Sequence, residues 1–352
     1  MTARQVTIED VARAAGVSRQ TVSNALNAPH RLRATTLARV TTAIDELGYQ
    51  PDQSARSLRT GTRRVIGYPA PADDPANPNP LMGGFLEALV TAADAVGHRI
   101  LLFRSDPRQG SAAVAKALGG LIAARQVDGF ILSDVVHDDP RVDSLADAGF
   151  PFTAFGRTAP GRPQTWVDID STTAMTGLVR TLLDQGHRRI CYLNSAAPLP
   201  WLADRRAGFL NAATAAPDGC FEVSVPADDP AALSRAVERL LTGPDRPTAL
   251  VCANDWLALT AYEAVRTTGL AVGTDIAVTG FNDIPLCTLL QPGLISVRLP
   301  LATIADALVD RLLRAAEDPA EAPGSGLLLP AEPIWRASTG SWHEQTQAQS
   351  RS

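Results

Sequence analysis

From Val65 onward the sequence alternates short apolar runs with longer helical patterns, and this alternation constrains the fold more than any other feature. Runs such as RILLF, DGFILS and TALVCAN are apolar along most of their length. The stretches between them repeat apolar residues at helical spacing. Such strands are typical of parallel sheets that are covered on both faces by helices. The alternation therefore predicts an α/β body.

The number of expected strands, about nine or ten, is more than one open sheet of this kind usually needs. We therefore expect two doubly wound parallel-sheet lobes over residues 65–340, with a cleft between them. The Pro-rich segment 68–80, YPAPADDPANPNP, is expected to be a loop over the mouth of this cleft. The polar tail, residues 341–352, is expected to be disordered.

A different pattern occupies residues 6–27, which read VTIEDVARAAGVSRQTVSNALN. Thr7 is expected to cap a first helix, Gly16 to end it in the left-handed conformation, and Ser18 to cap a second helix. A third helical pattern follows and stops at Gly48. Three helices around a few apolar residues make a small all-α domain.

The outer face of the expected second helix is rich in side chains that can form hydrogen bonds with DNA. It has no carboxylate and carries Arg19, Gln20, Ser23, Asn24 and Asn27. This is the layout of a helix-turn-helix whose second helix enters a DNA major groove. Residues 1–51 are therefore expected to be a helix-turn-helix DNA-binding domain, although the pattern alone also fits an ordinary pair of surface helices.

The formal charge is divided unevenly along the chain. The whole protein of 352 residues carries −5, but residues 1–64 contain ten arginines against five acidic residues. The remainder therefore carries −10. A basic N-terminal part on an acidic body indicates that only the N-terminal part meets phosphate, because the body repels a polyanion.

Several classes of protein are not supported by the sequence. No apolar run approaches the ~18 residues of a membrane span. The N-terminus is too polar for a signal peptide, so a cytoplasmic location is expected. The four cysteines lie far apart and fit neither a zinc site nor a disulfide framework. Because motifs of hydrolases, phosphate-binding loops and zinc proteases are also missing, we expect no enzymatic activity, no cofactor and no metal.

Further motifs follow the head pattern in a recognisable order. ELGYQPD and ARSLRTG come next, and the body carries VDID, LLDQGHRRI, RRAGF, CANDWLAL and DIAVTGFND. In order and spacing, from about Val6 to Gly340, these motifs resemble the lactose-repressor (LacI/GalR) family of bacterial transcription regulators. The resemblance implies a homodimeric regulator, most simply a repressor, that binds a near-palindromic operator in double-stranded DNA.

The resemblance assigns roles to individual residues of the DNA-binding domain. Arg19, Gln20 and Asn24 would contact base edges, which agrees with the ability of Arg to bind guanine and of Gln and Asn to bind adenine. Phosphates would be held by Ser18, Thr21, Ser23, Asn27 and Tyr49. For each of these residues the alternative is an exposed cap or an ordinary surface side chain.

Residues 52–64 are expected to form a hinge helix and linker. Asp52 could cap a short helix there, but so short a helix is marginal on its own in water. By resemblance, Leu58 would be a wedge that enters the minor groove and kinks the duplex. The alternatives are a flexible linker and a leucine that packs the linker against the body.

The body of this family resembles periplasmic sugar-binding proteins, which implies a small-molecule effector between the lobes. The effector would bias the orientation of the lobes and so the spacing of the hinges. The residues that would line or support the cleft are Arg157, Arg205, Asn254, Asp255 and Asn282. Guanidinium and amide groups suit vicinal hydroxyls because each engages two oxygens in fixed geometry. Asp255 could instead be only a helix N-cap, and Arg157 could be a surface loop residue.

Two departures from the family pattern bear on the identity of the effector. Asn282 stands where many members carry Asp, which removes a charge-assisted contact. Asp228 stands about where some members place an aromatic ring on the ligand. A sugar or sugar derivative is the first expectation, with a purine or another metabolite as the alternative. Rival functions are a sugar-binding receptor with no role on DNA and an enzyme of two doubly wound lobes.

Overall fold

The computed structural model describes residues 6–49, 62–70, 80–162, 164–226, 229–318 and 326–340. The chain separates into two compact units, Met1–Arg63 and Arg64–Ser352, which we call the head and the body and describe separately. Most of the expected hinge, including Leu58, lies outside the described residues. The same holds for most of the Pro-rich loop, for Asp228 and for the tail.

The head has the three expected helices. They are α1 (Ile8–Ala14), α2 (Arg19–Asn27) and α3 (Ala34–Leu47), with a short 3-10 helix η1 (Pro29–Arg31) before α3. The predicted boundaries are confirmed: Thr7 caps α1, Ser18 caps α2, and Gly48 ends α3 with a φ of 60°. Asp10 completes a capping box, because its carboxylate accepts from the backbone N–H of Thr7 at 3.0 Å.

The core of the head draws one valine from each helix. Val11, Val22 and Val40 have no exposed surface, and alanines of α1 and α3 fill the space around them. Burial of these apolar faces supplies most of the stability of such short helices. The polar face of α2 is therefore held outward on a fixed support.

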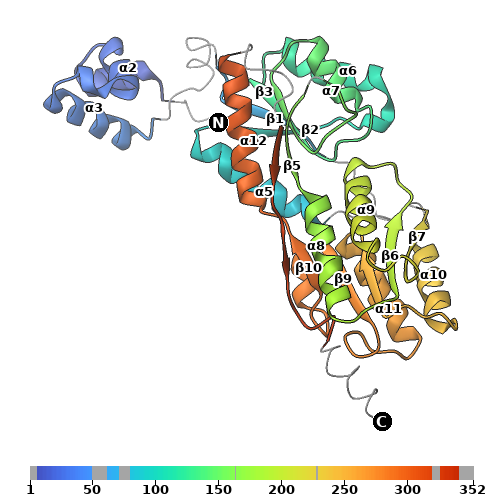
Figure 1. Ribbon diagram of the computed structural model, residues 1–352. Helices are drawn as coiled ribbons and strands as arrows, with labels where there is room; N and C mark the ends of the chain where they lie inside the picture. Colours follow the sequence, from blue (N-terminus) through green and yellow to red (C-terminus); the bar gives the residue numbers. More distant parts are fainter. Residues whose placement is uncertain are drawn as a thin grey trace. The chain divides into compact units, whose positions relative to one another are not determined.

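The first lobe of the body, lobe A, is a six-stranded sheet with helices on both faces (Figure 1). Its strand order is β11 (Gly326–Leu329), β5 (Thr165–Ile169), β4 (Phe152–Phe155), β3 (Gly129–Leu132), β1 (Val65–Ala70) and β2 (Arg99–Arg104). All neighbouring strands in it are parallel. Its helices are α5 (Leu81–Ala95), α6 (Ser111–Ala123), α7 (Pro140–Asp147) and α12 (Leu301–Glu317), with a 3-10 turn η2 (Pro107–Gln109).

Strand β3 shows why lobe A needs helices on both faces. Phe130 and Leu132 pack with Val114 and Leu118 of α6, whereas Ile131 points to the opposite face and joins the core of α5. Successive side chains of a strand alternate between faces, so an unbroken apolar run is stable only where both faces are covered. This confirms the expectation from the sequence.

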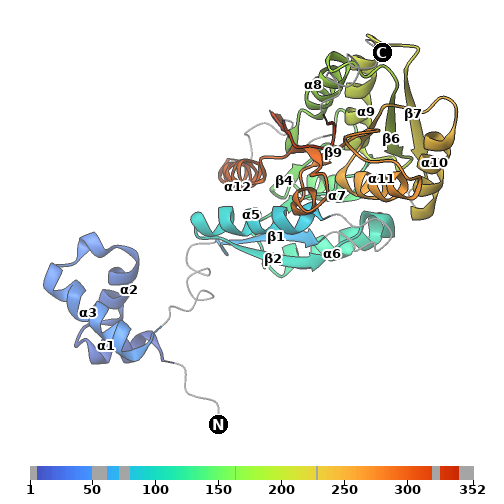
Figure 2. The same ribbon diagram turned by 90° about the horizontal axis from the view of Figure 1, so that it is seen from below.

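The second lobe, lobe B, repeats the architecture. Its strand order is β12 (Glu332–Ile334), β10 (Ile295–Arg298), β9 (Ala277–Asn282), β8 (Ala249–Cys252), β6 (Ile190–Ser195) and β7 (Cys220–Val225). Its helices are α8 (Ser171–Asp184), α9 (Pro200–Ala213), α10 (Pro230–Thr242) and α11 (Asp255–Thr267), with a 3-10 turn η3 (Pro285–Thr288). Figure 2 shows the strands lying between α8 and α9 on one side and α11 on the other.

The chain passes between the lobes three times within the described residues. It leaves lobe A after β5, returns after β10 into α12, and leaves again between β11 and β12. These crossings lie at Asp170, at Leu299–Pro300 and at Pro330–Ala331. Three short crossings side by side make a hinge, which allows the lobes to change their relative orientation.

The predicted architecture of two doubly wound lobes is confirmed, with one difference in detail. The described residues contain twelve strands, and β12 pairs antiparallel with β10. Strands β11 and β12 follow one another directly without a helix, so the strand–helix alternation gave no sign of them. An antiparallel edge strand on an otherwise parallel sheet is a common arrangement.

Candidate functional site

The outer face of α2 carries the predicted DNA contacts on one side of the head. Arg19 and Gln20 are exposed, and Thr21, Ser23 and Asn24 are partly exposed. The Nε2 of Gln20 donates to the Oδ1 of Asn24 at 3.0 Å, so the two amides form one unit. Because that bond uses the amide oxygen of Asn24, the unit presents the second N–H and the carbonyl of Gln20 together with the N–H groups of Asn24.

Two of the predicted phosphate contacts also have structural roles. The hydroxyl of Ser18 caps α2 by accepting from the N–H of Thr21 at 3.1 Å, and the two hydroxyls lie 2.9 Å apart. The ring of Tyr49 is partly buried against the core of the head. The side chain of Asn27 lies outside the description. Helix α2 itself has no acidic residue in its first turn, although the carboxylate of Glu9 in α1 lies 3.9 Å from the guanidinium of Arg19.

A cavity of about 630 Å³ lies between the two lobes of the body. This volume falls within the range of small-molecule sites. All five residues that the sequence predicted for the effector cleft line it: Arg157, Arg205, Asn254, Asp255 and Asn282. Most of them follow the carboxyl ends of parallel strands, where open α/β sheets bind ligands.

Arg205 of α9 is a buried cation without a carboxylate partner in its hydrogen bonds. Its guanidinium donates to the carbonyl of Ala253 at 2.6 Å and to the Oδ1 of Asn282 at 2.9 Å. It lies between the rings of Trp201 and Phe281, at 4.5 and 3.8 Å from their centroids. Burial lowers the pKa of Arg205 to about 10. Its Nε has no hydrogen-bond partner among the described residues, so the group is short of acceptors.

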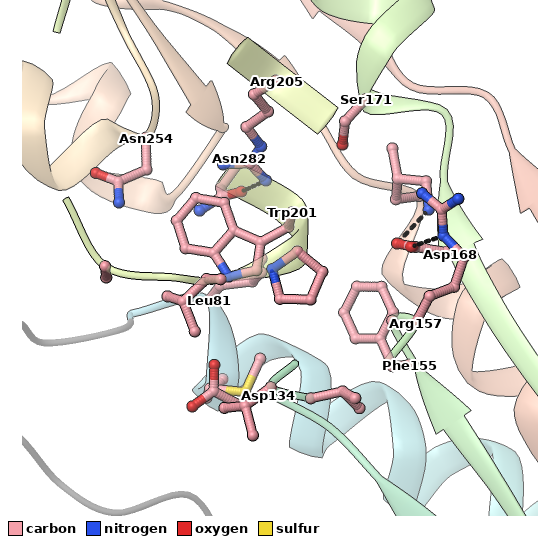
Figure 3. A pocket seen from close by; sticks show the side chains of 18 of the residues that line it. Leu81, Asp134, Phe155, Arg157, Asp168, Ser171, Trp201, Arg205, Asn254 and Asn282 are labelled. Atoms are coloured by element: carbon pink, nitrogen blue, oxygen red, sulfur yellow. Dashed lines mark hydrogen bonds and ion pairs between the residues drawn. The ribbon is translucent and has the colours of Figure 1, made fainter. Parts of the chain in front are cut away.

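Asn282 and Asn254 both turn N–H groups toward the cavity (Figure 3). The oxygen of Asn282 accepts from Arg205, which can only donate, and the oxygen of Asn254 accepts from the N–H of Leu257 at 2.9 Å. The remaining N–H groups of both amides are thus available to a ligand. This wall of lobe B therefore offers hydrogen-bond donors to a ligand.

The backbone at Asn282 is held in an unusual conformation. Its φ is 117°, and that of Asp283 is 52°. Such conformations cost roughly 1–3 kcal/mol for residues with a side chain and persist only where neighbours enforce them. The carboxylate of Asp283 is fixed by Arg298 and Arg336 at 2.6 and 2.7 Å, which supplies that support.

Asp255 is buried, links two parts of lobe B through hydrogen bonds, and is not the N-cap of α11. The N-cap is Asn254, and Asp255 is the first residue of the helix. Its carboxylate accepts from the N–H of Ile284 at 2.9 Å and from the hydroxyl of Ser296. Burial raises the pKa of Asp255. The N-cap alternative is therefore wrong, and Asp255 supports the cavity wall by tying α11 to the segment after β9.

Arg157 is partly buried in the cavity, and its guanidinium already forms hydrogen bonds with two carboxylates. Its Nε donates to Asp168 at 2.8 Å, and its Nη2 donates to Asp204. Its guanidinium also lies 5.3 Å from the centroid of the Trp166 ring. The alternative of a free surface loop residue is wrong, because the side chain lines the cavity and is held on two sides.

The sequence prediction missed several cavity residues. Asp134 follows β3, and its carboxylate points into the cavity with no hydrogen bond to it among the described residues (Figure 3). Its φ is 51°, and its carbonyl accepts from buried Arg141 at 3.1 Å. Asp134 keeps exposed surface, and partial desolvation raises the pKa of its carboxyl. Its position directly after a buried strand was the signal that could have identified it.

Aromatic side chains of the cavity were also missed. Phe155 ends β4 in lobe A, and Trp201 lies in the first turn of α9 in lobe B. Trp201 projects into the middle of the cavity in Figure 3. The sequence has Asp228 about where the family resemblance places an aromatic ring, and the structure provides an aromatic surface from other elements.

Two classes of site find no support in the described part of the chain. Those residues contain no group of three or more His, Cys, Asp or Glu that could hold a metal ion. They also contain no helix long and apolar enough to cross a membrane. The cysteines are unpaired, and burial raises the pKa of Cys191 to about 12.

Comparison with known proteins finds matches to both units. Residues 7–52 match the family model described as bacterial regulatory proteins, lacI family, and residues 179–339 match a periplasmic binding protein-like domain. The HTH-type transcriptional regulator AglR of Rhizobium meliloti (strain 1021) is 32% identical over 351 residues, which cover 95% of this chain and 94% of AglR.

Solved structures agree with the sequence matches. The lac repressor dimer bound to operator and the anti-inducer ONPF is 26% identical, with a TM-score of 0.78 over 96% of this chain and 100% of that one. A complex of the transcriptional regulator CelR with cellobiose is also 26% identical, with a TM-score of 0.66 over 95% of this chain and 100% of CelR.

Proposed function

The chain belongs to the lacI family of bacterial regulatory proteins and is a DNA-binding transcription regulator, and we propose that it is a repressor controlled by a sugar or sugar derivative in the cleft. Its operator is a near-palindromic site in double-stranded DNA. The α2 face with Arg19, Gln20 and Asn24 reads base edges, and neighbouring hydroxyls hold phosphates. Because its target is DNA, we infer a cytoplasmic location. We also infer that the protein has no enzymatic activity.

The observation that carries the effector assignment is the set of hydrogen-bonding groups around the cavity. Arg205, Asn254 and Asn282 offer donors from lobe B, and Asp134 offers an acceptor from lobe A. A polyhydroxylated ligand satisfies both walls, because each hydroxyl both donates and accepts. The rings of Trp201 and Phe155 offer apolar surface to its carbon skeleton. The CelR complex with cellobiose supports the same ligand class.

We also propose that the active form is a homodimer. A near-palindromic operator requires two heads related by a two-fold axis. The lac repressor of the comparison is a dimer on its operator. In the body, Leu289 beside η3 is 73% exposed and Leu286 within it is 42% exposed, which is costly for apolar side chains unless a partner covers them.

Two assays test the proposal. In a mobility-shift assay, the protein should retain a duplex from its own upstream region at salt concentrations that release a scrambled duplex. In a thermal-shift assay, cellobiose, maltose and galactose are compared with hypoxanthine and guanine, and a sugar should raise the melting temperature. The same sugar should release the retained duplex in the mobility-shift assay. Equal retention of both duplexes would contradict operator recognition. A response to a purine alone would contradict the sugar assignment.

A further inference from the structure

The contact between Arg157 and Asp204 joins the two lobes across the cleft. Arg157 belongs to lobe A, in the loop after β4, and Asp204 belongs to α9 of lobe B. The guanidinium donates to Asp168 of lobe A with Nε and to Asp204 of lobe B with Nη2. The side of Arg157 that faces Asp168 is visible in Figure 3. The side chain of Arg157 is therefore held by Asp168 within its own lobe and contacts Asp204 in the other lobe.

The charges around this contact are unbalanced. Asp168, Asp170 and Asp204 all act on Arg157, and their negative charges, with the Asp168 hydrogen bond, raise its pKa above the ordinary value although burial opposes this. Burial raises the pKa of Asp204, Arg157 lowers it, and Asp168 and Asp170 raise it further. The charge of Arg205 also lowers the pKa of Asp204, but Arg157 is the cation that contacts carboxylates of both lobes directly. Without it those carboxylates would repel each other more strongly.

The contact is also adjacent to the groups that would bind the effector. Asp204 immediately precedes Arg205 on α9, so any movement of Arg205 toward a ligand moves the same helical turn. Arg157 and Asp168 line the cavity themselves. Asp170, beside them, is one of the crossings between the lobes. The contact thus lies where a change in the cavity becomes a change in lobe orientation.

We propose that Arg157, Asp168 and Asp204 form an inter-lobe clasp that holds the two lobes in the arrangement of this structure. Arg157 then acts mainly by positioning the lobes, and Asp204 is its counterpart on lobe B. The effector changes the orientation of the lobes by acting on this clasp, a consequence that rests on the proposed function. The clasp itself depends on neither DNA nor effector.

The clasp predicts an unusual pattern in a double-variant experiment. Arg157→Gln removes the cation that bridges Asp168 and Asp204 and leaves only the charge of buried Arg205 acting on them, so the lobes should move apart. Asp204→Asn removes one restraint but also one negative charge, so its effect should be smaller. In the double variant the repulsion is relieved, and the lobes should lie closer together than in Arg157→Gln alone. A merely destabilising substitution would not be rescued in this way.

The distance between the lobes can be measured on the full chain without DNA or ligand. Spin labels on cysteines at exposed positions Lys116 of α6 and Arg239 of α10, in a Cys220→Ser background, report it by pulsed electron resonance. We expect a longer distance in Arg157→Gln and a return toward the wild-type distance in the double variant. The matched control Glu263→Gln breaks an ion pair within α11 and should leave the distance unchanged. An unchanged distance in Arg157→Gln, or a double variant no closer to wild type, would overturn the clasp.

A second comparison covers the case in which Arg157→Gln does not fold. Asp204→Glu keeps the negative charge and should keep the wild-type distance, whereas Asp204→Asn should broaden or lengthen it. Identical distances in these two variants would equally overturn the clasp. Operator affinity is then measured separately, and Asp204→Asn should change it by about 5-fold or more, the lower end of typical coupling between sites. Absence of operator binding in the wild type would instead contradict the proposed function and leave the distance result valid.

Discussion

The guanidinium of Arg205 donates to the side-chain oxygen of Asn282 at 2.9 Å, and this bond determines what lobe B offers to a ligand. Because Arg has no acceptor, Asn282 must present its oxygen to Arg205 and its N–H groups to the cavity. Among the described residues no carboxylate forms a hydrogen bond with this cation; a carbonyl, an amide and two aromatic rings contact it, and the charges of Asp255, Asp168 and Asp204 act on it from farther away. The family resemblance leads us to expect Asp at this position, and relative to that expectation this chain presents N–H donors to the cavity in place of a carboxylate.

Replacing that amide tests the exchange. Asn282→Asp should give buried Arg205 a charge-assisted partner and raise the melting temperature of the ligand-free protein by about 2–4 °C, which corresponds to ~1 kcal/mol in a domain of this size. It should also weaken binding of the sugar found by thermal-shift screening by roughly 10-fold, since the cavity loses a donor. Asn211→Asp, exposed on the same helix as Arg205, is the control. A lower melting temperature with unchanged sugar affinity would refute this view of the site.

The readout face of the head is tested by Gln20. Gln20→Ala should relax base preference at one operator position in a selection experiment, because a bidentate pair contributes about 1–3 kcal/mol of discrimination. It also frees the oxygen of Asn24, so the preference at the neighbouring position should change as well. Gln109→Ala, exposed in the body, should leave the preference unaltered. An unaltered preference for Gln20→Ala would remove this residue from the readout.

The close approach of α8 and α9 is tested by a pair of glycines. A Cβ at Gly208 of α9 would collide with the carbonyl oxygen of Thr172 and lie 2.8 Å from the Cβ of Met175, whereas a Cβ at Gly177 of α8 would meet nothing within 4 Å. Gly208→Ala should therefore lower the free energy of unfolding by roughly 1–3 kcal/mol. Gly177→Ala should be neutral or stabilise by up to about 1 kcal/mol. Urea denaturation of both variants measures the difference, and equal midpoints would show that the helices can move apart freely.

These results separate what local sequence determines from what only the folded chain reveals. The caps at Thr7 and Ser18 and the stop at Gly48 depend on neighbours within a few residues, and all three were predicted. The apolar strands were recognised for the same reason. In contrast, the contact of Arg157 with Asp204 spans 47 positions, and no periodicity in the sequence relates the two. The role of Asp255 depends on Ser296 and Ile284, which lie 41 and 29 positions away in the chain.

Acid sensitivity of the body should depend on His187. Its side chain has no exposed surface, its Nδ1 lies 3.0 Å from the hydroxyl of Thr248, and burial lowers its pKa to about 4. The unfolded chain takes up this proton near pH 6.5, so stability is unaffected above that pH and falls between about pH 6.5 and 4, by up to ~3 kcal/mol. Urea denaturation at several pH values in this range measures the free energy of unfolding. This free energy should fall less steeply with decreasing pH in His187→Gln than in the wild type. Exposed His137→Gln should keep the wild-type slope, and a wild-type slope in His187→Gln would assign the acid sensitivity to other groups.

Control of the head from the cleft is tested most directly by titrating one labelled operator duplex in the presence and absence of a sugar. Fluorescence anisotropy with the upstream duplex that the mobility-shift assay selects gives the affinity of the wild type and of Arg205→Ala. We predict that the sugar lowers the operator affinity of the wild type, whereas Arg205→Ala binds the same duplex with wild-type affinity and no longer responds. An Arg205→Ala protein that still responds at the same sugar concentration would contradict the assignment of the cleft as the controlling site.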